Sequence, residues 1–590
     1  MSRKGYVRAK ALRAGGGLCV ALPAQKILPK QFMAIKNYDS WDKSRLIEEV
    51  RRLSARKKYG LVWEDKPEDV VERCKTELPV LEEVEERAIE SDPSLPTNFI
   101  IEGDNYHALS VLNYTHAGKV DVIYIDPPYN TGNASWRYNN KIVDSEDAFR
   151  HSKFIAFLEK RLRLARSLLS KNGIIVVAID DYEIQNVRLL LDEIFGEENR
   201  LGTCVVIHNP GGRQDDKFFA TAHEYALFYS KDIKNAHIGH LELTEEKRDQ
   251  FTQVDEHGRY KLRGFIRTGA HSRPEDRPGL YYPIFVNEGS FEISVEPHKG
   301  WFELLPLDSK GEKRVWRWGK ATLLSNKEKY IECKKTKDGY SLSVKEREDD
   351  NKGTKPKTLW NNPEYSSAGA TGQVKSVFST EKIVFDYPKS IFLMLDTLKI
   401  TTSKNAVVLD FFAGSGTTGH AVMALNAQDG GTRSFILCAL NENRIAEEVT
   451  YLRIKNVIRG YAEVKGVPAN VRYFKTTFVP KSDVSDDTRR SLIEKSTEML
   501  CVKESTFKKV ADNKKFKIYR NQEQVTGILF DLDAIYEFKE KLDTTELPAS
   551  IYVFSLTSDN FSEDFDDLKI KHRIRPIPEG ILEVYRKIFA

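Results

Sequence analysis

The chain has 590 residues, of which 40% are hydrophobic and 30% are charged, with 30 Phe and 25 Tyr among them. The apolar content is ample for packed cores, which excludes global disorder. The chain is too long for a single core, which excludes a one-domain protein. The net charge is only +4, so a nucleic-acid surface requires local segregation of the Lys and Arg side chains.

Cysteine usage and hydropathy indicate a cytoplasmic protein without a membrane span. Six scattered cysteines form no CxxC pair and no secreted-type framework. No apolar run approaches the roughly 18 to 20 residues that cross a bilayer. The first 38 residues contain Lys and Arg but no acid. We interpret them as a disordered tail, or as sequence before a true start at Met33, in preference to a targeting peptide.

Residues 1–97 are predicted to be an N-terminal tail and helical region. A helix is expected from Ser40 to about Lys58, where apolar residues recur at helical spacing. The stretch from Glu82 to Pro96 is acidic and closed by prolines, so we interpret it as a linker.

Residues 98–231 alternate short apolar runs with longer amphipathic segments, which is typical of an α/β fold with a largely parallel sheet. The runs Val122–Ile125 and Ile174–Val177 lack polar alternation, as expected of strands covered on both faces. The predicted strands are Asn98–Ile101, Val120–Asp126, Gly173–Asp180, Cys204–His208 and Tyr225–Tyr229, and the predicted helices are Asn105–Thr115, Asp147–Ser170 and Tyr182–Phe195.

Between residues 232 and 380 this regularity gives way to Gly, Pro, aromatic and charged residues, which predicts an inserted domain. The α/β pattern resumes over residues 381–475. Residues 476–590 are richer in charge, and we interpret them as a separate α+β region open to subunit contacts. The elements predicted in the second α/β half are strands at Ala406–Phe412 and Arg433–Leu440, and helices at Pro388–Ile400, from Ser415 and at Arg444–Arg459.

A glycine-rich segment follows the strand predicted at Ala406–Phe412. It reads Asp410-Phe411-Phe412-Ala413-Gly414-Ser415-Gly416-Thr417-Thr418-Gly419, and its glycines fit a GxGxxG pattern that brings backbone close to a nucleotide-like ligand. Alone, this pattern also fits a NAD-dependent oxidoreductase or a structural turn. Asp410 would repel a pyrophosphate and suits a cationic ligand such as S-adenosylmethionine. His420 stands where a P-loop has lysine, which excludes a P-loop at this site.

A second motif, Asp126-Pro127-Pro128-Tyr129, ends an apolar strand at the sheet edge where α/β proteins bind ligands. The exocyclic amine of a base is a poor nucleophile, because its lone pair is delocalised into the ring. The Asp126 carboxylate and the Pro127 carbonyl would accept its N–H bonds and favour the charge that develops as a methyl group arrives. Tyr129 would stack on a base rotated out of the duplex. The alternative, a proline turn with a capping Asp, loses weight because both motifs occur in one chain.

At these residues the sequence resembles the DNA amino-methyltransferases. The DPPY loop precedes the glycine-rich loop, as in the permuted β class of N6-adenine methyltransferases. The resemblance covers residues 98–461 and implies a Rossmann-like, S-adenosylmethionine-dependent fold with a mixed, mostly parallel seven-stranded sheet. Residues 232–380 would be its target-recognition domain. Cytosine-N4 enzymes more often carry Ser where this chain has Asp126, so cytosine N4 methylation stays the alternative.

Several segments look like the modification subunits of type III restriction-modification systems. They are Ile101–Asn105, the DPPYNTGN loop at Asp126–Asn133, Phe385–Ser390 and Lys57–Trp63. This resemblance implies a site-specific methyltransferase that acts on double-stranded DNA, forms a homodimer and docks a separate restriction subunit. The sequence has no Walker A lysine motif and no convincing nuclease carboxylate cluster, so cleavage would belong to that other polypeptide.

The resemblance also assigns cofactor contacts. Asp104 and Asn105 would lie near the adenine of S-adenosylmethionine, and Lys389 and Ser390 near its amino-acid end. Many β-class enzymes carry a ribose-binding acid where this chain has Ala439, so Glu442 is the second choice for that contact. The predicted cofactor-binding set is Asp104, Asn105, Lys389, Ser390, Asp410, Phe411, Phe412, Gly414, Gly416, Thr417, Thr418 and Glu442.

For DNA contacts the sequence offers cations in the insert and before it, although most surface cations are simply solvated. We select Arg213, Lys217, Arg273 and Arg277. No metal site is expected, because single histidines such as His208 lack a spaced partner. A non-enzymatic DNA-binding module with a decayed site is a further alternative, against which the complete DPPY motif and loop glycines count.

Overall fold

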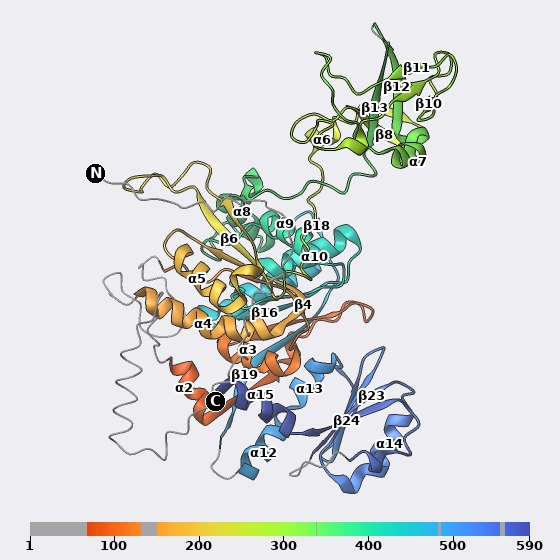
Figure 1. Cartoon of the computed structure of the whole chain (residues 1–590). Coiled ribbons are helices and arrows are strands. Elements are labelled where there is room, and N and C mark those ends of the chain that lie inside the picture. Colours follow the sequence, from red (N-terminus) through yellow and green to blue (C-terminus); the bar gives the residue numbers. More distant parts are fainter. Residues whose placement is uncertain (1–67, 131–149, 338, 482–484, 555–560, 590) are drawn as a thin grey trace, which may run out of the picture. The chain divides into compact units, whose positions relative to one another are not determined.

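The computed structural model describes residues 68–130, 150–337, 339–481, 485–554 and 561–589. Its largest element is a ten-stranded sheet in the order β1-β19-β2-β16-β15-β3-β4-β6-β5-β14. Figure 1 shows helices such as α4 and α5 beside the strands of this sheet. The helix predicted at Ser40–Lys58, the Lys57–Trp63 segment and residues Thr131–Asn133 of the DPPYNTGN loop lie outside the described residues. Within the described ranges, no helix is long and apolar enough to cross a membrane.

The seven strands predicted from the sequence form one uninterrupted block of this sheet. All neighbouring pairs within the block are parallel, except the two that β6 makes with β4 and β5. The predicted mixed, mostly parallel α/β sheet is therefore confirmed. In spatial order the strands are β2 (Thr97–Glu102), β16 (Ser434–Ala439), β15 (Val407–Asp410), β3 (Val120–Ile125), β4 (Leu169–Ile179), β6 (His223–Ser230) and β5 (Arg200–Ile207).

Three further strands extend the block, so the expected number of seven was too small. β14 (Leu359–Trp360) pairs with β5, and β19 (Asn470–Pro480) pairs with β2. β1 (Glu77–Glu83) pairs antiparallel with β19, and its apolar residues are buried. The linker predicted at Glu82–Pro96 is therefore wrong in its first part. The acidic and proline residues of this stretch indicated a linker, although an apolar edge strand begins just before them and extends into it.

Helices cover both faces of the sheet. Successive strand residues point to opposite faces, so Ile123 and Ile125 of β3 join one core while Val122 and Tyr124 join the other. The first core packs against α3 (Asn105–Thr115), α4 (Arg150–Leu168) and α5 (Ile184–Phe195); the second packs against α9 (Ile391–Thr401), α10 (Thr417–Asp429) and α11 (Tyr451–Arg459). Burial on both sides explains why β3 lacks polar alternation in sequence.

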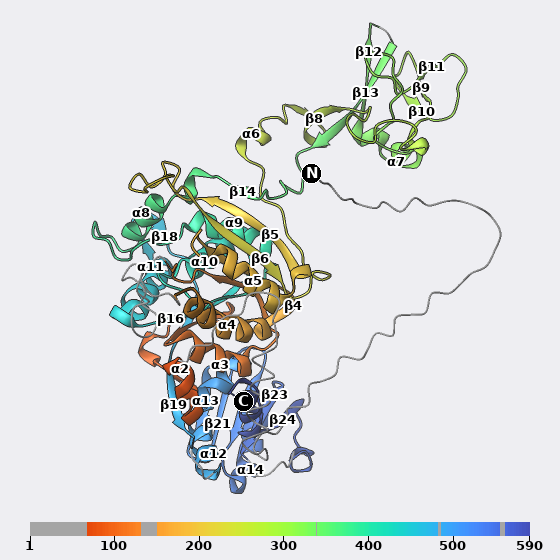
Figure 2. The same cartoon turned by 60° about the vertical axis from the view of Figure 1, so that its left-hand side comes forward.

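The insert, whose strands β8 to β13 lie together in Figure 2, has two sheets and a core of its own. In this core Phe265 stacks on Trp316 at 5.3 Å between ring centroids. After it, α8 (Ser367–Val377) and β14 rejoin the core of the large sheet through Trp360, Tyr365 and Val377. The elements of the insert are α6 (Glu245–Arg248), β7 (Gln253–Asp255), β8 (Gly258–Gly264), β9 (Ile284–Val286), β10 (Ile293–Ser294), β11 (Phe302–Leu304), α7 (Lys320–Tyr330), β12 (Ile331–Thr336) and β13 (Gly339–Arg347).

The C-terminal region forms a separate five-stranded mixed sheet with its own apolar core. Residues such as Tyr552 and Tyr585 also pack into the core that contains α3. The elements are α12 (Ser485–Glu494), α13 (Thr497–Glu504), β20 (Lys508–Asp512), β21 (Phe516–Arg520), β22 (Val525–Leu529), α14 (Ile535–Asp543), β23 (Ala549–Phe554), β24 (His572–Ile577) and α15 (Glu579–Phe589).

Candidate active site

Two loops leave the same edge of the large sheet from adjacent strands. β3 and β15 pair in parallel, with Val408 opposite Val122 and Leu409 opposite Ile123. Neighbouring strands lie about 4.8 Å apart, so the DPPY loop after β3 and the glycine-rich loop after β15 begin side by side. Two motifs that are far apart in the sequence therefore meet at the carboxyl ends of the strands.

Asp126 contacts a lysine from the distant segment before α9. Lys389 Nζ lies 3.2 Å from Asp126 Oδ1 and 2.5 Å from Glu224 Oε2. The same ammonium donates to the Tyr129 hydroxyl at 2.6 Å, and that hydroxyl donates to Glu224 at 2.9 Å. We call these four side chains the Lys389 cluster, in which two carboxylates share one ammonium.

The ammonium stabilises the two carboxylates unequally. Burial raises the pKa of the Asp126 carboxyl against the opposing effect of Lys389, and the Glu224 charge adds to the rise. For Glu224, burial acts in the same direction, but Lys389, His208 and Tyr129 outweigh it and the pKa is lowered. Both carboxylates raise the pKa of Lys389 despite its burial. The pKa values of the two carboxylates are therefore shifted in opposite directions.

The residue after the DPPY motif anchors the loop. Asn130 donates to Glu183 Oε1 at 2.6 Å, and this fully buried carboxylate also accepts from Asn186 at 2.7 Å and contacts His151 at 2.6 Å. Two prolines on one side and this network on the other fix the loop conformation.

The glycine-rich loop uses its glycines for two purposes. Gly414 and Gly416 have φ of +48° and +77°, a left-handed conformation that side chains disfavour. Gly419 has ordinary helix geometry, but a Cβ there would lie 2.8 Å from Ile454 Cδ1 and 3.0 Å from Leu437 Cδ1. The pattern therefore combines a tight turn with close packing of α10 against β16 and α11.

Asp410 organises this loop from inside. Its Oδ1 accepts from the Phe412 N–H at 2.9 Å, and its Oδ2 accepts from the Thr418 hydroxyl at 2.5 Å. Burial raises its pKa to about 7. The sequence argument placed a cationic ligand at Asp410, whereas the structure shows both oxygens bonded to the loop and its helix.

Arg453 of α11 holds the start of α10. Its Nη1 donates to Ser415 Oγ at 3.0 Å and to Thr417 Oγ1 at 2.8 Å, and burial lowers its pKa to about 10. The Thr417 hydroxyl also donates to the Lys389 carbonyl at 3.4 Å. Lys389 therefore touches both loops, the glycine-rich loop with its carbonyl and Asp126 with its ammonium.

Asp104 and Asn105 lie at the start of α3 and are buried beside the glycine-rich loop. Asn105 donates to the Phe411 carbonyl at 3.0 Å. The fully buried Arg161 donates to Asn105 Oδ1 at 2.5 Å and to Asp104 Oδ1 at 3.3 Å. Asp104 Oδ2 is buried without a hydrogen-bond partner in the described part of the chain. A free carboxylate oxygen at this place suits a ligand with hydroxyl or amino donors.

The other predicted cofactor residues are placed differently. Phe411 and Phe412 are 0% and 5% exposed and belong to the core. Ser390 accepts from the Phe392 N–H and so caps α9, and it donates to the Glu364 carbonyl at 2.8 Å. These three side chains shape the loops.

An acid that the sequence analysis missed lies beside Ala439. Glu102, at the end of β2, pairs with Ala439 in the sheet and accepts from Asn441 at 2.8 Å and from Tyr473 at 2.6 Å. Glu442 is exposed in the turn after β16. The expected acid was sought along one strand, while the neighbouring strand supplies one.

Residues 120–449, more than half of the chain, match the model of a family described as DNA methylase. The chain belongs to the DNA methylase family. It is 36% identical over 351 residues to the type II methyltransferase M.KpnI of Klebsiella pneumoniae, across 59% of this chain and 82% of the relative. It is 34% identical over 376 residues to the EcoPI Mod subunit of Escherichia phage P1, a type III restriction-modification enzyme, across 58% of each protein.

The DNA methylase therefore spans a little over half the length of that Mod relative. Among solved structures, the M1.HpyAVI–SAM complex is 16% identical with a TM-score of 0.26, across 60% of this chain and 96% of that one. The predicted family and its methyltransferase activity on DNA are confirmed by the family match. The cofactor of the family is S-adenosylmethionine. The left-handed glycine turn and the unpaired oxygen of Asp104, whose neighbour Asn105 bonds to the Phe411 carbonyl, fit it.

Two of the cations selected for DNA contact lie in the loop between β5 and β6 of the DNA methylase, at the same sheet edge as the DPPY loop. We call residues 209–222 the β5–β6 hairpin, because two backbone hydrogen bonds close it. The Asn209 N–H donates to the Ala222 carbonyl at 3.1 Å, and the Arg213 N–H donates to the Thr221 carbonyl at 2.9 Å. Arg213 and Lys217 are exposed. Arg273 and Arg277 are exposed in the insert between β8 and β9.

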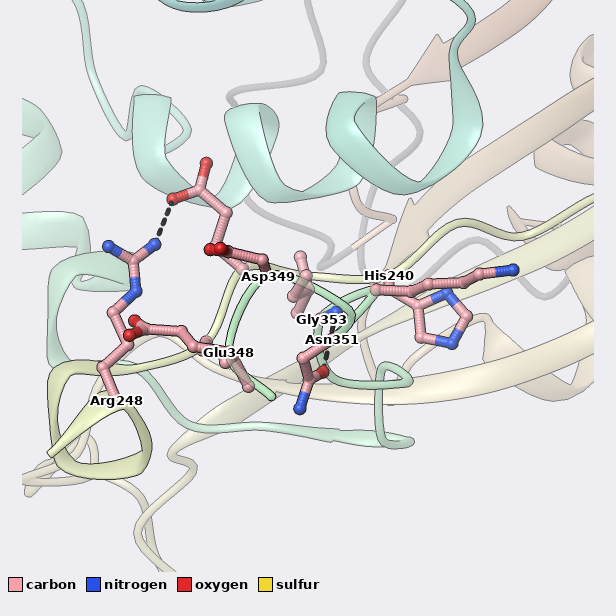
Figure 3. A pocket seen from close by; sticks show the side chains of 10 residues that line it. His240, Arg248, Glu348, Asp349, Asn351 and Gly353 are labelled. Atoms are coloured by element: carbon pink, nitrogen blue, oxygen red, sulfur yellow. Dashed lines mark hydrogen bonds and ion pairs between the residues drawn. The ribbon is translucent and has the colours of Figure 1, made fainter. Parts of the chain in front are cut away.

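Two cavities of the DNA methylase lie away from these loops. A pocket of about 330 Å³, where the chain enters and leaves the insert, is lined by residues such as His240, Arg248 and Asp349 (Figure 3). A cavity of about 1280 Å³ adjoins Asn470 and Lys503. Neither is lined by a residue that the sequence predicted for the site.

Sequence reasoning missed Glu224, Arg161 and Arg453. Glu224 left a signal, because it is a single charge in the apolar strand HEYALFYS and is only 4% exposed. The two arginines left none, since each lies on a helix among other charged residues.

Proposed function

We propose that this DNA methylase transfers a methyl group from S-adenosylmethionine to the N6 amino group of adenine in double-stranded DNA, after the base has left the duplex. One observation supports this most: Lys389 joins the two loops, with its carbonyl 3.4 Å from Thr417 Oγ1 and its ammonium 3.2 Å from Asp126. A cofactor held at the glycine-rich loop would therefore lie next to an amine held at Asp126.

S-Adenosylmethionine, when bound, supplies a methyl group on a positively charged sulfur and leaves as a neutral thioether. Asp126 and the Pro127 carbonyl accept the two N–H bonds of the amine, so that its lone pair is free to form the N–C bond. Asp126 then accepts the proton that the methylated nitrogen loses, a role for which its raised pKa suits it. The Tyr129 ring, tethered through its hydroxyl, stacks on the base.

The cofactor residues of this proposal act in two ways. Gly414 and Gly416 let the backbone approach the cofactor, and Asp104 offers a free oxygen. Asp410, Phe411, Phe412, Thr417, Thr418 and Ser390 shape the loops that hold it. Asn105 fixes the Phe411 carbonyl, and Glu102 joins Glu442 as a choice for the ribose hydroxyls.

The proposal is tested by methylation-aware sequencing of DNA from a host that expresses the chain, which reports the base, the position and the recognition sequence together. We expect N6-methyladenine at one motif. Methylation at cytosine N4 would favour the alternative activity, and tight binding of NADH without S-adenosylmethionine would favour an oxidoreductase.

We also propose that the β5–β6 hairpin contacts DNA, with Arg273 and Arg277 as further contacts from the insert. Its acids offset Arg213 and Lys217, but Phe218 and Phe219 are 83% and 90% exposed. Apolar contacts should therefore matter as much as charge. Alanine variants of Lys217 and Phe219 are compared in DNA binding at several salt concentrations, where only the Lys217 variant should flatten the salt dependence.

The finer assignment, that this is the modification subunit of a type III restriction-modification system, rests on the Mod relatives and the motif segments. It implies a homodimer and a restriction subunit as partner. Light scattering of the purified chain, alone and with a restriction subunit from the same source, tests both. A monomer that methylates its site unaided would favour a solitary enzyme.

A further inference from the structure

The Lys389 cluster holds one carboxylate more than an ion pair needs. Glu224 on β6 is 4% exposed and lies 2.5 Å from the Lys389 ammonium, whereas Asp126 lies 3.2 Å from it. Buried charge is costly unless it is well paired. Two carboxylates that share one ammonium therefore call for an explanation beyond stability.

The ammonium occupies a position that the substrate needs. In the proposed reaction Asp126 accepts an N–H bond from the amino group of the base, and Lys389 contacts that carboxylate beforehand. An ammonium has three N–H donors. The Lys389 ammonium makes its two shorter contacts with the Tyr129 hydroxyl, at 2.6 Å, and with the Glu224 carboxylate, at 2.5 Å. Lys389 can thus leave Asp126 and still keep two partners.

We propose that Glu224 is a positioning residue for methyl transfer, which holds the Lys389 ammonium beside Asp126 so that the amino group of the base can replace it there. The proposal rests on the proposed function. With Glu224 in place, the incoming base displaces only the longest of the contacts. Without its charge, Lys389 would pair with Asp126 alone, and the base would compete with a complete buried ion pair.

The charges around Asp126 predict how its titration responds. Glu224 raises the pKa of Asp126 and Lys389 lowers it. Removal of the Glu224 charge should therefore lower the pKa of Asp126, and removal of the Lys389 charge should raise it. The other groups that face the cluster are Tyr124 on β3, Asp180 after β4, His208 after β5 and Asp410 on β15.

The test compares wild type, Glu224→Gln, Lys389→Met and the double variant in tritiated methyl transfer to DNA across pH. For Glu224→Gln we expect kcat to fall about tenfold, equivalent to about 1.4 kcal/mol. Its acid limb should move to lower pH, and that of Lys389→Met to higher pH. Because Glu224 acts through Lys389, adding Glu224→Gln to Lys389→Met should cost about twofold or less.

Glu504 of α13 offers a matched control. It is also 4% exposed, accepts from the Tyr552 hydroxyl at 2.6 Å and pairs with Arg573 at 2.5 Å, but it lies in the C-terminal region. Glu504→Gln should lower the melting temperature while the acid limb stays where it is. A purely structural role for Glu224 predicts the same result for Glu224→Gln.

The pKa of Asp126 is also measured without turnover, by infrared difference spectra against Asp126→Asn. Two results would overturn the role of Glu224 but leave the proposed function intact, provided that the wild type is active. The first is an unchanged Asp126 pKa in Glu224→Gln, and the second is a fully additive effect in the double variant. A wild type that methylates no DNA overturns the proposed function and this role with it. If Glu224→Gln does not fold, the comparison of Lys389→Met with the double variant decides, because no lone ammonium is buried in either.

Discussion

The two loops at the catalytic edge each begin with an aspartate at the end of a strand, yet the two carboxylates have different partners. Asp410 is bonded to neutral donors, the Phe412 N–H and the Thr418 hydroxyl, within its own loop and helix. Asp126 instead faces Lys389 and, through it, Glu224.

The difference teaches that an aspartate at the end of a strand can serve either to fix a loop or to bind a substrate. The Asp410 carboxylate is bonded to its own loop and helix and fixes the turn. The Asp126 carboxylate contacts an ammonium that has two other partners, so it can exchange that contact for a substrate. Under the proposed function, the glycine-rich loop shapes the cofactor site, and the DPPY loop carries the group that accepts the amine.

The largest effect is expected from Asp126→Ala. Loss of the group that accepts the amine N–H and its proton should lower kcat by about 1000-fold, while S-adenosylmethionine still binds at the separate loop. Tritiated methyl transfer measures the first quantity and titration calorimetry the second. Unchanged transfer would refute the role given to Asp126.

Asp410→Ala should affect cofactor binding more than the methyl-transfer step, the opposite of Asp126→Ala. It leaves the Phe412 N–H and the Thr418 hydroxyl without an acceptor, which costs about 1–3 kcal/mol for each buried group. We expect a lower melting temperature and cofactor binding weakened by about tenfold or more. Asp410→Asn, which keeps one acceptor, is the control and should lose less. Equal cofactor affinity in all three proteins would show that Asp410 does not shape the cofactor loop.

The sequence allowed the strands and the two motifs to be predicted, because burial on both faces and strand-ending motifs are local patterns. Residues such as Val122 and Ile125 carry that pattern within a few positions. The Lys389 cluster could not be predicted in this way. Its members come from three distant segments, and only the register of the sheet brings Glu224 to Tyr129.

The edge of the sheet shows the same limit. β1 contains a short apolar run next to a long acidic one, and its partner β19 lies nearly 400 residues away, with Leu81 opposite Thr476. Composition over a window therefore indicated a linker. The pairing that makes it a strand is visible only in three dimensions.

A smaller effect, on stability alone, is expected from Gly419→Ala. The new methyl group would lie 2.8 Å from Ile454 Cδ1, and such overpacking costs about 1–3 kcal/mol. Ile454→Val removes that carbon, so the double variant should melt closer to wild type than Gly419→Ala does. If Ile454→Val brings no recovery, the contact with Leu437 is the one that limits packing.

The pH dependence of stability tests the Asp410 side of this comparison. Burial raises the pKa of Asp410 from its ordinary value of 3.8 to about 7, so between these values the folded protein binds a proton that the unfolded chain releases. The stability that Asp410 contributes is therefore fully present below about pH 4 and falls as the pH rises towards 7. In Asp410→Asn this group no longer titrates. The melting temperature of the wild type should therefore fall relative to that of the variant as the pH rises from 4 to 7, and the difference between the two should stay constant above pH 7. A difference that stays constant from pH 4 to 7 would mean that the carboxyl is ionised throughout, as a hidden cation beside it would require, and the contrast between the two loops would disappear.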